Sequence, residues 1–133
     1  MANEAIEIEG PYETHDFTVA AGTGIEKGTI LKLTDPRTAS ATSASGDVVA
    51  GIARTEKVAN DGSTNLGVYT KGIFDLTVTS GQTVTAGELV SIGGANTIKT
   101  ATEAEIAAGK AIGKALEDGS SEEVIEVAVN TLK

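Results

Sequence analysis

The chain carries one segment twice: VAAGTGIEKGTILKL at residues 19–33 and VTSGQTVTAGELVSI at residues 78–92. The copies align without a gap at an offset of 59 residues (from 19 to 78), and both keep a leading valine, two shared glycines and a closing apolar triplet. Such a pattern predicts a strand, a glycine turn, a buried apolar side chain, a second glycine turn and a short apolar strand. The repeat therefore predicts two similar β units in one chain.

Glycines mark the turns of these units. The second glycine of each copy, Gly28 or Gly87, is expected at positive φ, where glycine is favoured over residues with a side chain. Further glycines occupy matching places in both halves of the chain. The glycines that we expect at structural turns are Gly22, Gly28, Gly51, Gly81, Gly87 and Gly113.

The correspondence continues beyond the quoted segments. VAGIA at 49–53 resembles AIGKA at 111–115 at an offset of 62 residues, and LGV at 66–68 resembles IEV at 125–127 at the original offset of 59. The slip indicates a short insertion at residues 102–110. There Thr102 and Glu105 have the spacing of a capping box, which predicts one or two helical turns ended by a glycine.

The predicted fold is therefore all-β: a small β-barrel or sandwich with an internal two-fold pseudo-repeat. A single β domain at residues 17–133 contains two halves, about 17–76 and 77–133, which we expect to share one core. Two copies are too few for a solenoid, which needs at least three stacked units. Valine, isoleucine, leucine and alanine must fill this core, because aromatic residues make up only 3% of the chain.

Charge and composition exclude several classes of function. The net charge is −9, from 10 basic and 19 acidic residues, which disfavours nucleic acid as a partner. Cysteine is absent, which excludes disulfides, thiol catalysis and cysteine-bound metals. The acidic N-terminus does not resemble a signal peptide, and no stretch approaches the ~20 apolar residues that a membrane span needs.

An N-terminal arm, residues 1–16, lies outside the repeat. Within it Ile6 and Ile8 alternate with Glu7 and Glu9, which predicts an extended strand, and a Gly-Pro turn follows. Two interpretations remain open. The arm can pair with a sheet edge on another chain, or it can be an edge strand folded onto its own domain.

The sequence contains no recognisable active site. His15 is the only histidine, and no Gly-x-Ser-x-Gly motif accompanies it, so we expect it in a loop leading to the strand at Phe17. No phosphate-binding loop, His-x-x-x-His pair or calcium loop is present in the sequence. We expect no catalytic residues, no cofactor and no metal.

Four runs of residues resemble the capsid cement, or head decoration, proteins of tailed bacterial and archaeal viruses, a group with a β-tulip fold. They are GIARTE at 51–56, TKGIFDL at 70–76, VTAGELV at 84–90 and IGKALE at 112–117, within a resemblance covering about residues 17–131.

The resemblance implies a non-enzymatic structural protein of the virion, made in the host cytoplasm, that stabilises the outer capsid surface. It implies a homotrimer over three-fold or quasi-three-fold positions, with an N-terminal segment that grips the major capsid protein. In this chain, the arm residues that we would expect to bind the capsid are Glu4, Ile6, Glu7, Ile8, Glu9, Pro11 and Tyr12.

Two other classes are weighed against this one. A β-clip or carrier-like binding module without catalysis is the main alternative, but a carrier needs a modifiable lysine at a hairpin tip, commonly beside methionine, and the single methionine is Met1. A sugar-binding domain would need aromatic side chains on which sugars stack, and the chain has few.

Overall fold

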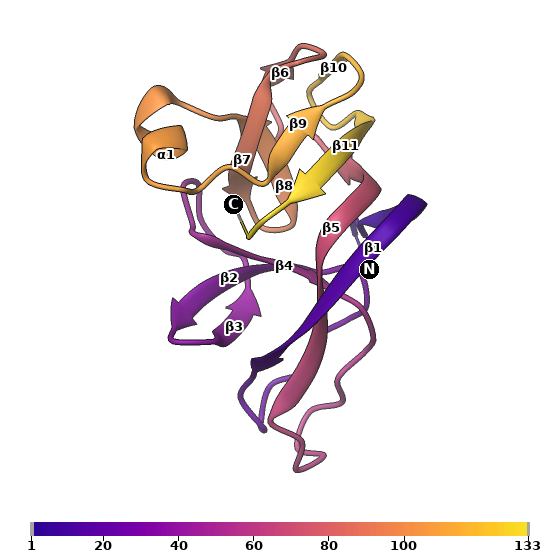
Figure 1. The fold of residues 1–133 in the computed structure, drawn as a ribbon, viewed down its shortest axis with the longest axis vertical. Helices are drawn as coiled ribbons and strands as arrows, with labels where there is room; N and C mark the ends of the chain where they lie inside the picture. The colour runs from indigo at the N-terminus through magenta and orange to yellow at the C-terminus, as the bar shows by residue number, and fades with distance from the viewer. Residues whose placement is uncertain (1, 133) are drawn as a thin grey trace.

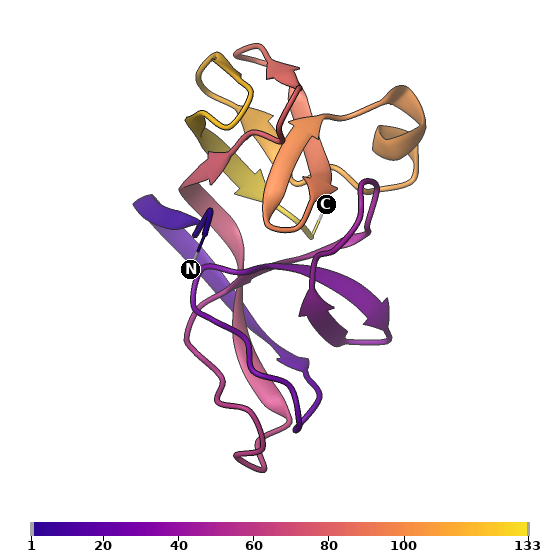
Figure 2. The same ribbon diagram turned by 180° about the vertical axis from the view of Figure 1, so that it is seen from behind.

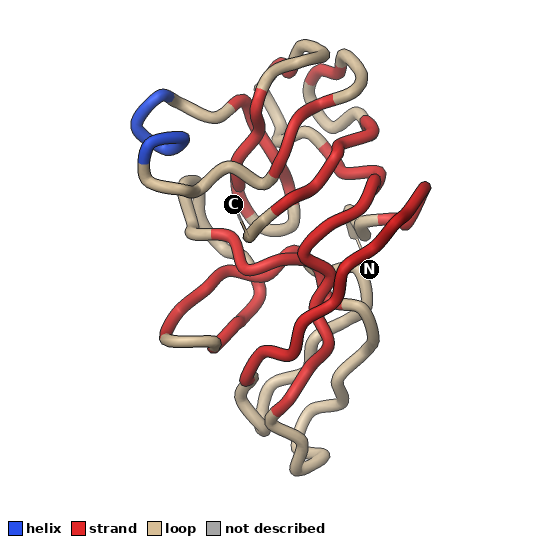
Figure 3. The backbone as a smooth tube through the Cα atoms, viewed as in Figure 1, coloured by secondary structure: helices blue, strands red, loops and turns tan. Residues whose placement is uncertain are grey.

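The computed structural model describes residues 2–132, and this part of the chain is almost entirely β (Figures 1 and 3). The strands are β1 (Ile6–Thr18), β2 (Ile30–Asp35), β3 (Thr38–Ala41), β4 (Val49–Ala53), β5 (Asn65–Thr77), β6 (Thr83–Val84), β7 (Leu89–Gly94), β8 (Thr97–Thr100), β9 (Gly113–Ala115), β10 (Gly119–Ser120) and β11 (Val124–Asn130). A five-residue helix, α1 (Glu103–Ala107), completes the described elements, and it is far too short to cross a membrane.

Most strands belong to one nine-stranded sheet in the order β1-β3-β2-β4-β5-β11-β9-β7-β8, and β6 pairs with β10 separately. An additional pairing joins β1 to β5, so the pairings of the first half run in a cycle through β1, β3, β2, β4 and β5. In the second half β8 is joined back to the end of β5 by a bridge between Ile98 and Val78. The strand β5 is therefore common to both halves.

The two halves occupy opposite ends of the molecule. Figure 1 shows β2 and β3 in the lower part and β6 to β11 in the upper part, with β5 running between them. Strands β1 and β5 lie side by side over much of the length of the molecule in both views (Figures 1 and 2), consistent with their long antiparallel register. The molecule is thus elongated along this pair of strands.

Backbone hydrogen bonds recur at the spacing of the sequence repeat. The N–H of Val19 donates to the carbonyl of Thr64 at 2.9 Å, and 59 residues later Val78 donates to Glu123 at 2.8 Å. Other recurring donor and acceptor pairs are Thr29 to Glu26 with Glu88 to Thr85, Gly28 to Ala53 with Gly87 to Ala115, and Thr42 to Ile30 with Ala101 to Leu89. The repeat in the sequence is therefore also a repeat in the hydrogen bonding.

The expectation of one shared core holds only in part, because the buried apolar side chains form two clusters and the halves share only the larger one. The smaller cluster lies in the first half: Phe17, Val19, Ile25, Leu31, Ala39, Ala50, Ala53, Leu66 and Val68. Each of these nine has its repeat counterpart in the larger cluster. That cluster takes in Ala5 from the arm and, from the first half, Ile30, Val49, Ile52, Phe74 and Leu76. Each half therefore fills its own interior, and the larger cluster also joins the halves.

The short helix lies where the sequence predicts an insertion. Thr102 is the N-cap of α1, its side chain accepts from the N–H of Glu105, and the Glu105 carboxylate accepts from the N–H of Thr102. Glu105 also accepts from Ser91 at 3.0 Å and from Lys99 at 2.7 Å. The capping box therefore ties α1 to β7 and β8 as well as starting the helix.

Candidate interaction surface

Strand β1 lies at a margin of the sheet. One of its edges pairs with β5, and in the described part of the chain the other edge is unpaired from Ile6 to Phe17. The residues expected to contact a capsid all lie in this strand or just before it: Glu4, Ile6, Glu7, Ile8, Glu9, Pro11 and Tyr12. An edge strand folded onto its own domain therefore describes this structure, and the boundary expected at residue 16 falls inside a continuous strand. Contact with a capsid stays a prediction.

An aromatic cluster holds β1 on the body. The ring of Tyr12 packs 5.2 Å from Tyr69 and 5.5 Å from Phe74, centroid to centroid. A Cβ at Gly72 would overlap the Tyr12 ring, so the glycine makes room for this contact. The hydroxyl of Tyr69 donates to the carboxylate of Glu7 at 2.7 Å. Burial is the larger cause, and this hydrogen bond the next, of the raised pKa of Tyr69. These rings pack on one another instead of forming an open stacking platform for a sugar.

The residues just before β1 are also anchored. Ala5 is buried, and its N–H donates to the carbonyl of Gly28 at 3.0 Å. The side-chain amide of Asn96 donates to the carbonyls of Asn3 at 2.6 Å and Gly28 at 3.3 Å, while its oxygen accepts from the N–H of Ile30. Asn96, in the turn between β7 and β8, thus links the start of the chain to both halves.

Beyond these anchors, Ile6 and Ile8 remain open to solvent. The two residues are 46% and 43% exposed. Ile6 stands opposite Asp75 of β5, whose neighbours Phe74 and Leu76 point into the core, so Ile6 shares the outward face of the sheet with Asp75. Large apolar side chains on this edge are available to a partner.

The predicted turn glycines divide into two groups. Gly22, Gly28, Gly81 and Gly87 lie in turns, and φ is 83° at Gly28 and 93° at Gly87. The expectation of turns at Gly51 and Gly113 is wrong, because Gly51 lies inside β4 and Gly113 is the first residue of β9. There a Cβ would overlap the carbonyl oxygen of the neighbouring strand, at Tyr69 or Ala128, so glycine is needed for close strand approach.

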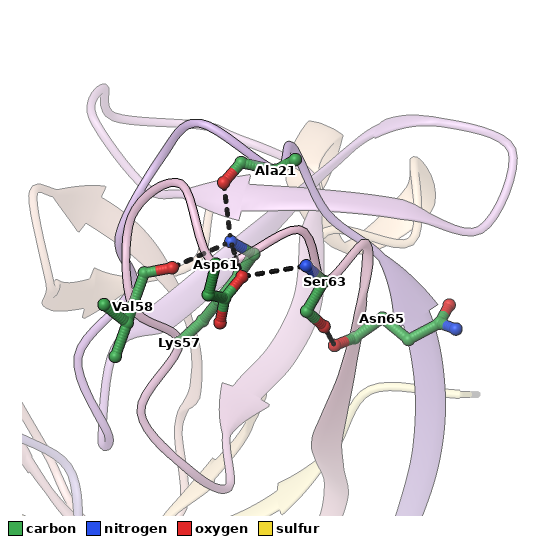
Figure 4. A network of polar contacts seen from close by, with 6 residues as sticks. All are labelled: Ala21, Lys57, Val58, Asp61, Ser63 and Asn65. Carbon is green, nitrogen blue, oxygen red and sulfur yellow. Dashed lines mark hydrogen bonds and ion pairs between the residues drawn. The ribbon is translucent and has the colours of Figure 1, made fainter.

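A buried lysine stiffens the loop at residues 56–64, at the end of the molecule away from α1. Only 2% of the Lys57 side chain is exposed, and its ammonium donates to the carbonyls of Ala21 at 2.9 Å and Val58 at 3.2 Å and to the carboxylate of Asp61 at 3.2 Å (Figure 4). The pKa of Asp61 is lowered, chiefly by the hydrogen bond from the N–H of Ser63 and to a smaller extent by the hydrogen bond from Lys57. Val58 is 61% exposed in this loop.

A row of outward side chains crosses the second half. Asp75 of β5 stands opposite Glu126 of β11, and Glu117 follows β9 beside them. Carboxylate oxygens of these three residues lie within 4.8 Å of one another, and burial followed by Glu117 raises the pKa of Asp75. Exposed acidic groups commonly gather without an ion, so this cluster is not assigned as a metal site. Leu116 and Val124, 43% and 58% exposed, lie beside it.

A shallow apolar groove of about 510 Å³ lies farther along the same strands, between them and the α1 segment. Its apolar lining includes Leu89, Ile106 and Ala128, of which Ile106 is 41% exposed. Lys71 and Lys114 also line it, and neither forms an ion pair in the described part of the chain. The groove therefore combines apolar surface with two free ammonium groups.

His15 lies inside β1 opposite Val68, not in a loop as expected, and it is exposed.

Sequence reasoning did not identify the residues that organise these surfaces. Lys57 and Asn96 act through contacts between distant residues, and Lys71 and Lys114 come together only when β5 and β9 are placed in one sheet. The repeat holds one usable signal. Lys57 corresponds to Gly119 at the offset of 62, so the loop that contains Lys57 and its counterpart in the second half are expected to differ in their polar contacts.

Comparison with known proteins places these features in context. A family model described as phage cement protein matches residues 8–131. Among solved structures, the head fiber N base of bacteriophage phi29 superposes with a TM-score of 0.52 at 13% sequence identity, covering 90% of this chain and 96% of that one. At this identity the likeness concerns the fold alone. No curated protein sequence matches the chain.

Proposed function

The chain belongs to the phage cement protein family, and on that premise we propose that it binds the major capsid protein as a homotrimer and holds neighbouring capsid subunits together. The family is a structural one of the virion, and its members act at the capsid surface. The family match over residues 8–131 carries this proposal, because it includes nearly all of β1 as well as the body. The carrier-like alternative is not favoured.

The exposed start of β1 is the proposed capsid contact. Ile6 and Ile8 offer apolar surface on an edge strand, and the alternating Glu7 and Glu9 give it negative charge. Both oxygens of the Glu7 carboxylate are already engaged, since Oε2 accepts from the Tyr69 hydroxyl and Oε1 pairs with Lys27 at 3.4 Å. Glu9 is therefore the more available partner for lysine or arginine on the shell. Binding through it is expected to weaken as salt rises.

The structure changes how such a contact would form. Strand β1 is already paired with β5 on both sides of its irregular middle, at Ile6 to Glu9 and from Glu13 onward, so binding by this surface does not require the ordering of a free arm. Ordering a disordered segment costs about 1–2 kcal/mol per residue in backbone entropy, and a preformed strand avoids that cost. Three such strands in one trimer would act together, because each bound strand raises the effective concentration of the others.

Several features of β1 argue against simple strand addition. The β1–β5 register is interrupted by irregularities between Glu7 and Glu9, between Glu9 and Glu13, and between Glu13 and Thr14. Pro11 has no N–H to donate. Bulges, proline and charge are the features by which edge strands avoid pairing with other strands. We therefore propose that side chains, chiefly Ile6 and Ile8, make the contact.

Co-sedimentation with undecorated capsids tests this proposal. The variant Ile6→Asp/Ile8→Asp should fold, because both side chains are exposed, and it should lose capsid binding. Val58→Asp is the matched control, since Val58 is 61% exposed in a distant loop. If the double variant binds as tightly as the parent, the contact lies elsewhere. If the parent itself does not sediment with capsids, the cement function is refuted.

Truncation before Phe17 is a poorer test. It would remove Tyr12 from the rings of Tyr69 and Phe74, and it would uncover the edge of β5. The truncated chain is therefore expected to lose stability, so a loss of binding would not report on the contact itself. The point substitutions avoid this problem.

A further inference from the structure

The outward face of β5, β11 and β9 carries apolar side chains that no other described layer covers. Ile73 and Ala128 stand opposite each other in β5 and β11 and are half-buried. Leu116 and Val124 are 43% and 58% exposed on the same side of the second half. A contiguous apolar patch on an uncovered sheet face indicates an interface, whereas apolar side chains scattered singly over a surface do not.

Charge is divided along this face. At one end, which we call the acidic end, lie Asp75, Glu117 and Glu126. At the other, the lysine end, Lys71 and Lys114 line the apolar groove. The two ends are close together, because Lys114 stands opposite Ala128, two residues along β11 from Glu126, or about 7 Å.

We propose that this face joins copies of the chain, with the acidic end of one copy seated against the lysine end of the next. The proposal rests on the homotrimer proposed above and supplies its contact. Lys71 and Lys114, which form no ion pair among residues 2–132, would meet carboxylates. The clustered carboxylates would meet cations. Leu116 and Val124, beside the acidic end, would enter the apolar groove beside the lysine end.

A second copy fits this face for reasons of charge. The chain carries −9 overall, so copies repel on average, and association needs a contact at which cations of one copy meet carboxylates of the other. A second copy is certain to present the complementary acidic end. The contact is heterologous, since different surfaces of the two copies meet, and such contacts close into a ring when the rotation permits. The three-fold closure is taken from the proposed homotrimer, because adjacent complementary ends on one face also fit a two-fold pair.

Charge reversal tests the contact by sedimentation velocity. The parent should associate, and Lys114→Glu or Glu126→Lys alone should each raise the dissociation constant on the order of a hundredfold, because like charges then face each other. Combining both changes in one chain should restore association. Lys32→Glu, in β2 of the other half, is the control for net charge and should associate like the parent. Urea melts establish that each variant folds.

Two results would overturn the proposal. One is a parent that stays monomeric at every concentration reached. The other is a Lys114→Glu or Glu126→Lys chain that associates as the parent does, or a double variant that stays apart. An equal mixture of the two single variants also reports on symmetry. Alternating complementary contacts can close a two-fold pair but leave one mismatched contact in a ring of three, so full recovery in the mixture would refute the three-fold arrangement.

These measurements are independent of capsid binding. A monomeric Lys114→Glu chain that still sediments with capsids would leave the cement function standing. A parent that forms trimers but ignores capsids would refute that function and leave this contact intact.

Discussion

Gly28 and Gly87 occupy the same turn in the two halves, yet substitution by alanine should lower the free energy of unfolding much more at Gly28 than at Gly87. Both residues have positive φ, 83° and 93°, so alanine is strained by about 1 kcal/mol at either position. At Gly87 a Cβ would meet nothing within 4 Å. The expected loss of unfolding free energy for Gly87→Ala is therefore about 1 kcal/mol.

At Gly28 the new methyl group would collide with the start of the chain. Its Cβ would overlap the side chain of Glu4 and come within 2.9 Å of the carbonyl oxygen of Ala5. To make room, Ala5 must leave its buried position and give up its hydrogen bond to the Gly28 carbonyl. The lost hydrogen bond and the exposed methyl group each add about 1 kcal/mol. The total expected for Gly28→Ala is about 3 kcal/mol.

Urea unfolding of the parent and both variants measures the difference. Native-state hydrogen exchange at the Ala5 amide should speed up in Gly28→Ala and stay unchanged in Gly87→Ala. Equal destabilisation by the two substitutions would refute the reasoning, because it would mean that residues 4 and 5 do not pack against the turn.

Three further predictions concern polar groups. Burial alone raises the pKa of Glu105, but its hydrogen bonds, that from Lys99 foremost, lower it from 4.5 to about 2. The stability gained is present above about pH 4.5 and is lost as the pH falls toward 2, and Glu105→Gln should flatten this part of a pH series of urea melts. Asn96→Ala should lower the free energy of unfolding by about 3 kcal/mol or more in the same assay. It leaves buried backbone groups without their hydrogen-bond partner and places alanine at a φ of 56°. Asn96→Gly should recover only the share of this loss that comes from the positive φ. Lys57→Met should lower the free energy of unfolding by about 2–3 kcal/mol, because three oxygens lose the ammonium group that donates to them. It should also raise the rate of proteolysis within residues 56–64. Unchanged proteolysis would show that other contacts hold the loop.

The repeat allowed much of the backbone to be predicted from the sequence. Apolar alternation in β5 and β11 identifies the buried face, and glycine at Gly28 and Gly87 identifies matching turns. The capping box at Thr102 predicts α1 because that signal is local. Patterns of this kind depend on neighbours within a few residues, so one sequence suffices to read them.

Other features depend on contacts that local patterns do not encode. A glycine needed for a turn and one needed for close strand approach look alike in a sequence, which explains the error at Gly51 and Gly113. The sequence pattern identifies which apolar residues are buried, but the same residues would be buried whether they form one cluster or two. The partner of β1 was ambiguous because alternation in Ile6 to Glu9 fits any sheet edge. Asn96 binds Ile30 across 66 positions, a separation at which no spacing rule applies.

The shared strand β5 also has a mechanical consequence. Its antiparallel neighbour β1 begins opposite Asp75 and ends opposite Asn65, beside the loop at residues 56–64. A force that draws Ile6 away from that loop pulls the two strands in opposite directions along their length. The hydrogen bonds between them are then loaded in shear and must fail together, whereas a force across the strands would open them one at a time. A protein held at the start of β1 and loaded at its far end would resist an expanding shell through this long overlap.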